Sequence, residues 1–222
     1  MHWYGYVGGD PINNNDPTGY FTEIDSATGK VMNVVFDGTT NIISSPYRQG
    51  QRLQGPGQLV GNSFAQDSFT IPPEDLPKDK RHIVHPVGTV NLNSSIDGYI
   101  SQQLAKNYGY FETWSKSRSG QELDLKTDSC MGGAYAGHQF QGNYMTMREA
   151  GNMLAGMNAA RLGMDFEHFQ KGAGAYHDAG KLGIINYLIF GTTYGDSPEW
   201  GEIPYQRTRS KYGYELYNQG FR

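Results

Sequence analysis

The chain has 222 residues, of which 37% are hydrophobic and 13% aromatic, and it carries a formal net charge of −4. This length is enough for one or two domains with a sizeable core, and the aromatic content argues against wholesale disorder. A near-neutral chain lacks the basic character of a strong nucleic-acid binder, although a local basic patch can still bind RNA. The single cysteine, Cys130, excludes an intrachain disulfide and a cysteine metal site. No run of 18 apolar residues is present, so we expect no membrane-spanning helix and no secretion signal.

The first twenty residues are dense in Gly, Pro, Asn and Asp, which predicts a series of turns. Their stretch YGYVGGDPINNNDPTG resembles the end of the Rhs/YD-repeat core, which closes with a proline, four residues and then Asp-Pro-x-Gly. Here Pro11 precedes Asp16-Pro17-Thr18-Gly19. In that family the segment seals a β-cage, and autoproteolysis just beyond it frees a variable C-terminal toxin. The resemblance implies that residues 1–20 are the end of such a core.

Residues 21–90 alternate short β-prone runs with turns and predict a β-prone linker region. The expected strands and connections are a strand at 30–36, a turn at 37–38, a strand at 41–44, a loop at 45–61, and further strands at 68–71 and 82–84. His82 and His85 lie three residues apart but lack a third ligand nearby, so we predict no metal site there.

Residues 91–222 predict a mainly helical domain, which makes the expected fold class of the whole chain α+β. Ser94 is expected to cap a helix with an apolar stripe at every fourth residue, namely Ile96, Ile100 and Leu104. Residues 121–126 alternate as a strand does, which would place Asp124 and Lys126 on one face. The glycine-rich stretch 127–142, which contains His138, is interpreted as a loop.

The stretch 147–163 predicts a central helix, because Met147, Ala150, Leu154 and Met157 recur at spacings of three and four. Glu149 and Asn152 share another face, where they could converge on one ligand. Gly151, Gly156 and Gly163 are each unfavourable in a helix by about 1 kcal/mol relative to alanine. Either close packing against a neighbouring element or a substrate lying against the helix would explain them.

The last sixty residues predict a second helix capped by Asp165, followed by the most apolar run of the chain at 181–190. We interpret that run as a buried strand or short helix. His168 and His177 lie off the apolar stripe of the capped helix, and either could act as a base near neutral pH.

Three short blocks in a fixed order make residues 92–215 resemble the polymorphic toxin family called bacterial toxin 44. The first block, Asp124-Leu125-Lys126, is similar to a WDYK-type motif. The second block is Glu149-Ala150-Gly151-Asn152 with Gly156, Ala160 and Gly163, and it is similar to a DFGNFNYGATGAAxG pattern. The third block, Tyr194-Gly195-Asp196-Ser197-Pro198, is similar to YGDDP. Departures include leucines where the first motif has aromatic residues. The resemblance implies an interbacterial toxin domain at 91–222 with a cognate immunity protein, delivered by the Rhs core cage and secretion machinery.

The side-chain inventory of these blocks suits acid–base hydrolysis, in which one carboxylic acid donates a proton and another carboxylate activates water. We predict catalytic roles for Asp124, Lys126, Glu149, Asn152 and Asp196, and substrate contacts for Gly151, Gly156, Tyr194 and His138. Many tyrosines and little positive charge favour a cell-envelope glycan such as peptidoglycan as the substrate.

Two alternatives stay open at the level of the sequence. A ribonuclease toxin acting in the target cytoplasm would use His138 or His177 as its base, Lys126 or Arg209 on phosphate, and Asn152 for orientation. A non-catalytic orphan Rhs tip would be either an unexpressed cassette or a domain that only binds. Cofactors and metal dependence are left open as well.

Overall fold

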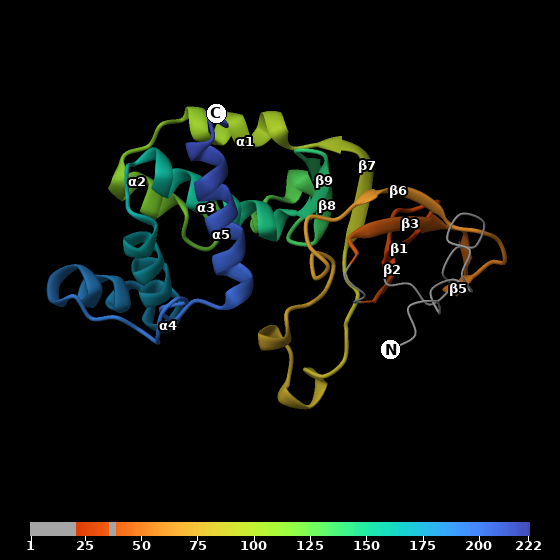
Figure 1. The fold of residues 1–222 in the computed structure, drawn as a ribbon, viewed down its shortest axis with the longest axis horizontal. Coiled ribbons are helices and arrows are strands. Elements are labelled where there is room, and N and C mark those ends of the chain that lie inside the picture. Colours follow the sequence, from red (N-terminus) through yellow and green to blue (C-terminus); the bar gives the residue numbers. More distant parts are fainter. Residues whose placement is uncertain (1–20, 36–38) are drawn as a thin grey trace, which may run out of the picture. The chain divides into compact units, whose positions relative to one another are not determined.

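A computed structural model describes residues 21–35 and 39–222, so the predicted Rhs core end at 1–20 and the turn at 37–38 lie outside the described residues. The predicted α+β class is confirmed, with 42% helix and 21% strand and with a strand region preceding the helices. The chain forms two compact units (Figure 1). The described residues of the first unit are 21–35, 39–95 and 135–146, and the second unit contains residues 96–134 and 147–222. The segment 135–146 therefore returns to the first unit from within the predicted helical domain.

A four-stranded sheet with the order β2-β1-β3-β6 forms part of the first unit. Its strands are β1 (Thr22–Asp25), β2 (Val31–Val34), β3 (Asn41–Ser45) and β6 (Gln58–Asn62). Strands exist within the expected range 30–36 and at 41–44 as β2 and β3, and each of them pairs with β1 and not with the other. Strand β1 lies between them, antiparallel to β2 and parallel to β3.

A three-stranded sheet with the order β7-β8-β9 completes the first unit, together with a short two-stranded ribbon. These strands are β7 (Thr89–Ser95), β8 (Ala136–Phe140), β9 (Asn143–Thr146), β4 (Tyr47–Arg48) and β5 (Gln51–Arg52). The loops predicted at 45–61 and 127–142 thus contain strands, whereas the strands predicted at 68–71 and 82–84 do not form. Phe69 is nevertheless fully buried and packs with Ile24, Ile42 and Tyr144 in the core of this unit.

Five α-helices make up most of the second unit in the described part of the chain. They are α1 (Asp97–Ala105), α2 (Tyr110–Lys116), α3 (Met147–Arg161), α4 (Phe166–Phe190) and α5 (Pro204–Asn218). The apolar stripe predicted for α1 is confirmed, because Ile96, Ile100 and Leu104 are buried. The predicted cap of α1 was wrong, since Ser94 belongs to β7 and Ile96 occupies the cap position. Asp165 does cap α4, where its carboxylate accepts a hydrogen bond of 3.1 Å from the backbone N–H of His168.

Helix α3 is the centre of the second unit, and its predicted apolar face is confirmed. Met147, Ala150, Leu154 and Met157 are at most 1% exposed. Helices α3 and α5 lie side by side (Figure 1) and approach closely, because the Cβ of an alanine at Gly156 would lie 1.8 Å from the carbonyl oxygen of Ser210. The glycine at this position is explained by helix packing.

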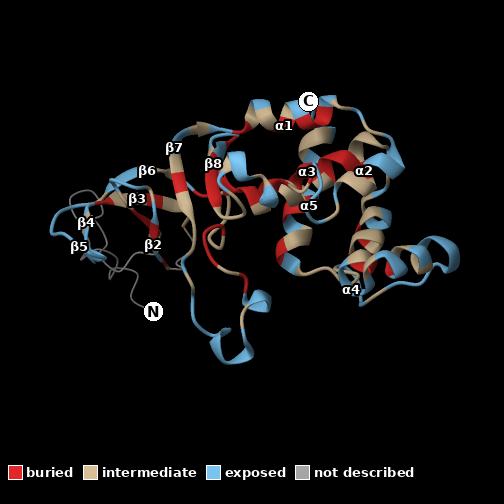
Figure 2. Ribbon diagram, turned by 180° about the vertical axis from the view of Figure 1, so that it is seen from behind, coloured by how far each residue is buried: buried red, intermediate tan, exposed pale blue. Residues whose placement is uncertain are grey.

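Helix α4 is broken at Gly180, whose φ of 59° and ψ of −140° are not helical. The part after the break is the apolar run 181–190. It is helical, which was one of the two predicted alternatives for this run. The predicted burial was wrong, because large apolar side chains of this part are exposed (Figure 2), namely Leu182, Ile185, Leu188, Ile189 and Phe190. In the part of the chain that the structure describes, no helix is both long and apolar enough to cross a membrane.

Candidate functional site

Asp124 and Lys126 lie together, although not on a strand as predicted. Lys126 belongs to a short 3-10 turn (Leu125–Thr127) that Asp124 precedes. The Lys126 ammonium lies 3.6 Å from a carboxylate oxygen of Asp124, and the other Asp124 oxygen accepts a hydrogen bond of 2.9 Å from the backbone N–H of Gly120. The Asp124 side chain is 9% exposed, whereas that of Lys126 is 48% exposed. Lys126 is therefore the more exposed member of the pair, and Asp124 holds the turn.

Glu149 is part of the packing between α3 and α5. Its carboxylate oxygen Oε1 accepts hydrogen bonds from Nε and Nη2 of Arg209, at 3.1 and 2.9 Å. Both side chains are almost completely buried, and the Arg209 guanidinium stacks 4.0 Å from the centroid of the Tyr205 ring. A buried pair with these contacts holds two helices in register, and removing one partner would leave an unpaired buried charge. Glu149 and Asn152 do not share a site as the sequence suggested.

Asp196 and Tyr194 belong to the segment between α4 and α5. Asp196 is exposed, and its backbone carbonyl accepts a hydrogen bond of 2.9 Å from the N–H of Trp200. The Tyr194 hydroxyl is 3.4 Å from Nδ2 of Asn186. The three predicted carboxylates thus have three separate environments, and none of them lines the cavity described below.

His138 is located in the first unit, on β8 and not in a loop. It is 6% exposed, and its Nδ1 lies 2.8 Å from the hydroxyl oxygen of Ser94 on β7. The contact joins two paired strands of one sheet. His138 therefore belongs to a different compact unit from the other predicted site residues.

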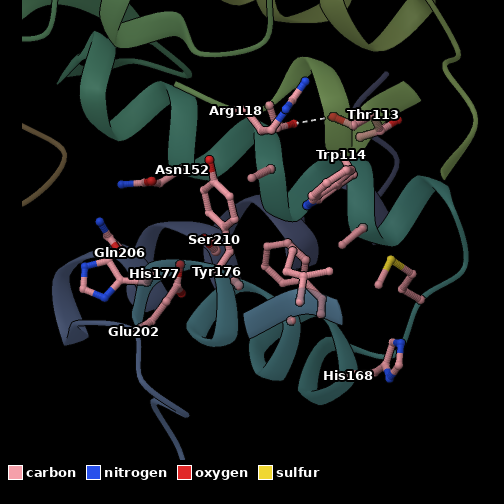
Figure 3. A pocket seen from close by; sticks show the side chains of 18 of the residues that line it. Thr113, Trp114, Arg118, Asn152, His168, Tyr176, His177, Glu202, Gln206 and Ser210 are labelled. Carbon is pink, nitrogen blue, oxygen red and sulfur yellow. Dashed lines mark hydrogen bonds between the residues drawn. The ribbon is translucent and has the colours of Figure 1, made fainter. Parts of the chain in front are cut away.

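A cavity of about 410 Å³ opens among α2, α3, α4 and α5 in the second unit (Figure 3). This volume lies in the range of small-ligand sites, which is about 300–1,000 Å³. Two of the predicted site residues, Lys126 and Asn152, line it. Figure 3 shows Asn152, His177, Glu202 and Gln206 gathered on one side, and we call these four residues the polar end.

His177 is oriented by the chain that follows α4. Its Nδ1 lies 3.0 Å from the carbonyl oxygen of Gly201. Because a carbonyl can only accept, Nδ1 must carry the proton, and Nε2 of the neutral ring is then an acceptor. A histidine held in this tautomer can take a proton from a substrate hydroxyl group.

Glu202 lines the same end of the cavity and is held by a buried amide. Nε2 of Gln170 donates a hydrogen bond to Oε2 of Glu202 and a second one, of 3.3 Å, to the carbonyl oxygen of Glu199. Burial raises the pKa of Glu202 to about 7, although the hydrogen bond from Gln170 and the charge of Arg207 both lower it. A carboxyl group with this pKa can donate a proton near neutral pH.

Gly174 allows the loop with Glu202 to approach α4. The Cβ of an alanine there would lie 1.7 Å from the carbonyl oxygen of Trp200 and 3.2 Å from the backbone nitrogen of Glu202. The small residue is therefore required where the loop passes over the helix. It brings Glu202 to the cavity that His177 also lines.

The permanent charges on the cavity lining are positive when Glu202 is protonated, and one of them, that of Lys126, is paired with Asp124 outside the lining. Arg118 and Lys126 line the cavity, and Glu202 is the single carboxylate among the described lining residues. Such a site favours an anionic ligand. In the part of the chain that the structure describes, no three His, Cys, Asp or Glu side chains are grouped as a metal site would need.

Sequence reasoning named His177 as an alternative base but missed Glu202 and Gln170. Glu202 has no sequence motif around it, and its burial depends on the approach of the loop to α4. Gln170 and Gly174 are one helical turn apart, which places both on a single face of α4. This spacing was the one signal of the arrangement that the sequence contained.

Comparison of the chain with protein-family models, with curated proteins and with solved structures finds no match.

Proposed function

We propose that the chain is the effector end of an Rhs/YD-repeat polymorphic toxin, and that its helical unit is a ribonuclease acting in the cytoplasm of a target bacterium. The observation that supports the chemistry is that His177, Glu202 and Lys126 line one cavity. The short motifs described above support the toxin assignment. In this proposal the Rhs core cage and secretion machinery deliver the domain, and a cognate immunity protein protects the producing cell.

The proposed reaction is cleavage of an RNA phosphodiester by its own 2′-hydroxyl group. Nε2 of His177 takes the 2′-hydroxyl proton, and the 2′-oxygen forms a bond to phosphorus. The bond from phosphorus to the 5′-oxygen breaks, and the carboxyl group of Glu202 gives its proton to that leaving oxygen. The products are a 2′,3′-cyclic phosphate and a free 5′-hydroxyl, and the two side chains exchange protonation states.

Lys126 and Asn152 supply the contacts that this reaction needs on the phosphate. The Lys126 ammonium is half-exposed at the cavity and can pair with a non-bridging oxygen, on which negative charge grows in the transition state. The Asn152 amide from α3 can donate a hydrogen bond to a second oxygen. Arg209 has no such role in this proposal, because it is buried against Glu149.

Hydrolysis of an envelope glycan is the second candidate, and the raised pKa of Glu202 favours it, because glycosidases need such an acid. A glycosidase generally needs a second carboxylate as well, and Glu202 is the one carboxylate among the described lining residues. The presence of a histidine and a lysine, His177 and Lys126, in the lining is therefore better suited to a phosphodiester.

The test is expression of the chain in bacteria, either retained in the cytoplasm or exported to the periplasm. We expect growth arrest and degraded RNA when the chain stays in the cytoplasm. His177→Ala and Glu202→Gln should each reduce RNA cleavage by the purified chain by about 10²–10⁴-fold, the usual contribution of an acid or base. His82→Ala and Glu112→Gln are matched controls on exposed residues outside the cavity, and both should retain activity.

Three outcomes would contradict the proposal. Toxicity confined to the exported chain, with intact RNA, would favour the glycan. Unchanged RNA cleavage by both His177→Ala and Glu202→Gln would show that this cavity is not the active site. Absence of toxicity in both compartments would favour a non-catalytic tip.

A further inference from the structure

The cavity has another side that the proposed chemistry does not use. Figure 3 shows Trp114 and His168 on the side away from His177, Glu202 and Gln206. Tyr187 lies on that side as well, since its hydroxyl is 2.6 Å from Nδ1 of His168. We call Trp114, His168 and Tyr187 the aromatic end. The rest of the lining contributes further apolar side chains, including Leu162, Met164, Phe169 and Ile184.

The rings of the aromatic end are held by contacts that do not involve a ligand. The Arg118 guanidinium lies 5.5 Å from the centroid of the Trp114 ring and is itself fixed by two hydrogen bonds of 3.1 Å to Ser115. The rings of His168 and Tyr187 are 5.3 Å apart and tilted by 45°. These aromatic faces are therefore in place before a ligand arrives, which reduces the entropy lost on binding.

The dimensions of the cavity fit one unpaired nucleotide and not a duplex. A site of about 410 Å³ has room for a single base with its sugar and phosphate, whereas a double helix presents its bases only along its grooves. Proteins that bind single-stranded RNA splay out bases and stack them on aromatic side chains or on arginine. A cavity with the proton acceptor His177 and the proton donor Glu202 on one side and aromatic rings on the other has both parts of such a site.

We propose that the aromatic end is a base slot that takes one unpaired nucleobase of a single-stranded RNA, beside the phosphodiester held at the polar end. The inference rests on the proposed ribonuclease function, and it names the substrate class of that site. Trp114 supplies the main stacking surface.

The test compares two oligonucleotides, each with one ribonucleotide in an otherwise deoxyribose strand, so that one linkage can be cleaved. The second oligonucleotide has abasic sugars on both sides of that linkage. Trp114→Leu should raise KM for the complete strand about tenfold, which is the scale of one base stacked on an aromatic ring. The same variant should change cleavage of the abasic strand by less than about twofold, because the contact it removes is already missing.

Two further variants separate stacking from folding. Trp114→Phe keeps a ring and should recover most of the affinity. Phe111→Leu alters an aromatic residue of the same helix that is 77% exposed and outside the cavity lining, so KM should stay at its original value. An equal increase in KM for the complete and the abasic strand in Trp114→Leu would overturn the base slot. Equal cleavage of the complete single strand and of the same strand in a duplex would also overturn it.

A binding measurement keeps this inference separate from the proposed reaction. If the unaltered chain cleaves no RNA, the ribonuclease proposal fails, and calorimetry with a nucleoside 5′-monophosphate and with ribose 5-phosphate then tests the slot alone. Tighter binding of the nucleotide, lost in Trp114→Leu, would support the slot. Equal binding of the two compounds, or binding of neither, would overturn it.

Discussion

Burial of Glu202 couples the stability of the fold to pH. The carboxyl group titrates near its usual 4.5 in the unfolded chain and at about 7 in the folded chain. As the pH rises from 4.5 towards 7, the unfolded state loses this proton while the folded state keeps it. The contribution of Glu202 to the free energy of unfolding is therefore fully present below pH 4.5 and is lost by about pH 7.

Two substitutions test this coupling through stability alone. Glu202→Gln cannot ionise, so it should be more stable than the original chain at pH 8 by about 1–3 kcal/mol, with little difference at pH 4. Gln170→Leu removes the hydrogen bond that lowers the pKa of Glu202, so the free energy of unfolding of this variant should fall more steeply between pH 4 and pH 8. Denaturant unfolding across this pH range measures both effects. A pH dependence that Glu202→Gln leaves unchanged would contradict the assignment.

At the scale of elements, the contact of α3 with α5 explains one of the glycines that made α3 conspicuous in the sequence. The Cβ of an alanine at Gly156 would meet the carbonyl of Ser210, and one at Gly213 would lie 2.0 Å from the carbonyl oxygen of Met153. These positions come from two helices, so each helix carries a small residue where the other's backbone passes. Gly163 lies beyond the end of α3 with a φ of 69°, so it imposes no cost on the helix interior.

Two alanine substitutions in α3 should therefore have opposite effects. Gly156→Ala should destabilise the chain by about 1–3 kcal/mol, because the added methyl group forces the helices apart. Gly151→Ala has ordinary contacts of 3.7 and 3.8 Å with Leu125 and should stabilise the helix by up to about 1 kcal/mol. Thermal unfolding distinguishes the pair, and two shifts of the same sign would contradict this explanation. Reduced RNA cleavage by a more stable Gly151→Ala would support its predicted substrate contact.

The elements that the sequence predicted best are those with a local signal. The stripe of Met147, Ala150, Leu154 and Met157 needs no partner to be recognised, and the Asp165 cap is formed within four residues. The parallel pairing of β1 with β3 joins Thr22 to Ile42 across the intervening strand β2, and no local pattern encodes it. The same limit applies to the site: Lys126 and Asn152 came from motifs, whereas Glu202 becomes a cavity residue only through the fold.

At the scale of the whole molecule, the first unit is discontinuous, and this affects where the chain can be shortened. Strand β8 pairs with β7 on one side and β9 on the other, and Tyr144 of β9 packs with Phe69. A fragment of residues 96–222 would retain β8 and β9 without β7 or that core. We expect it to bind the dye ANS and to aggregate, unlike a fragment of residues 21–222. Equal solubility and equal thermal midpoints of the two fragments would contradict this view.

The return of residues 135–146 to the first unit also sets an order of events on the ribosome. Strand β7 emerges more than forty residues before β8, its parallel neighbour, so it waits without that partner while α1 and α2 are synthesised. Pairing over such a separation is slow, because the intervening loop must close first. The first unit can therefore be completed only when residue 146 has left the exit tunnel, and α3 follows directly after it. Slowing translation just after this point should raise the yield of folded chain.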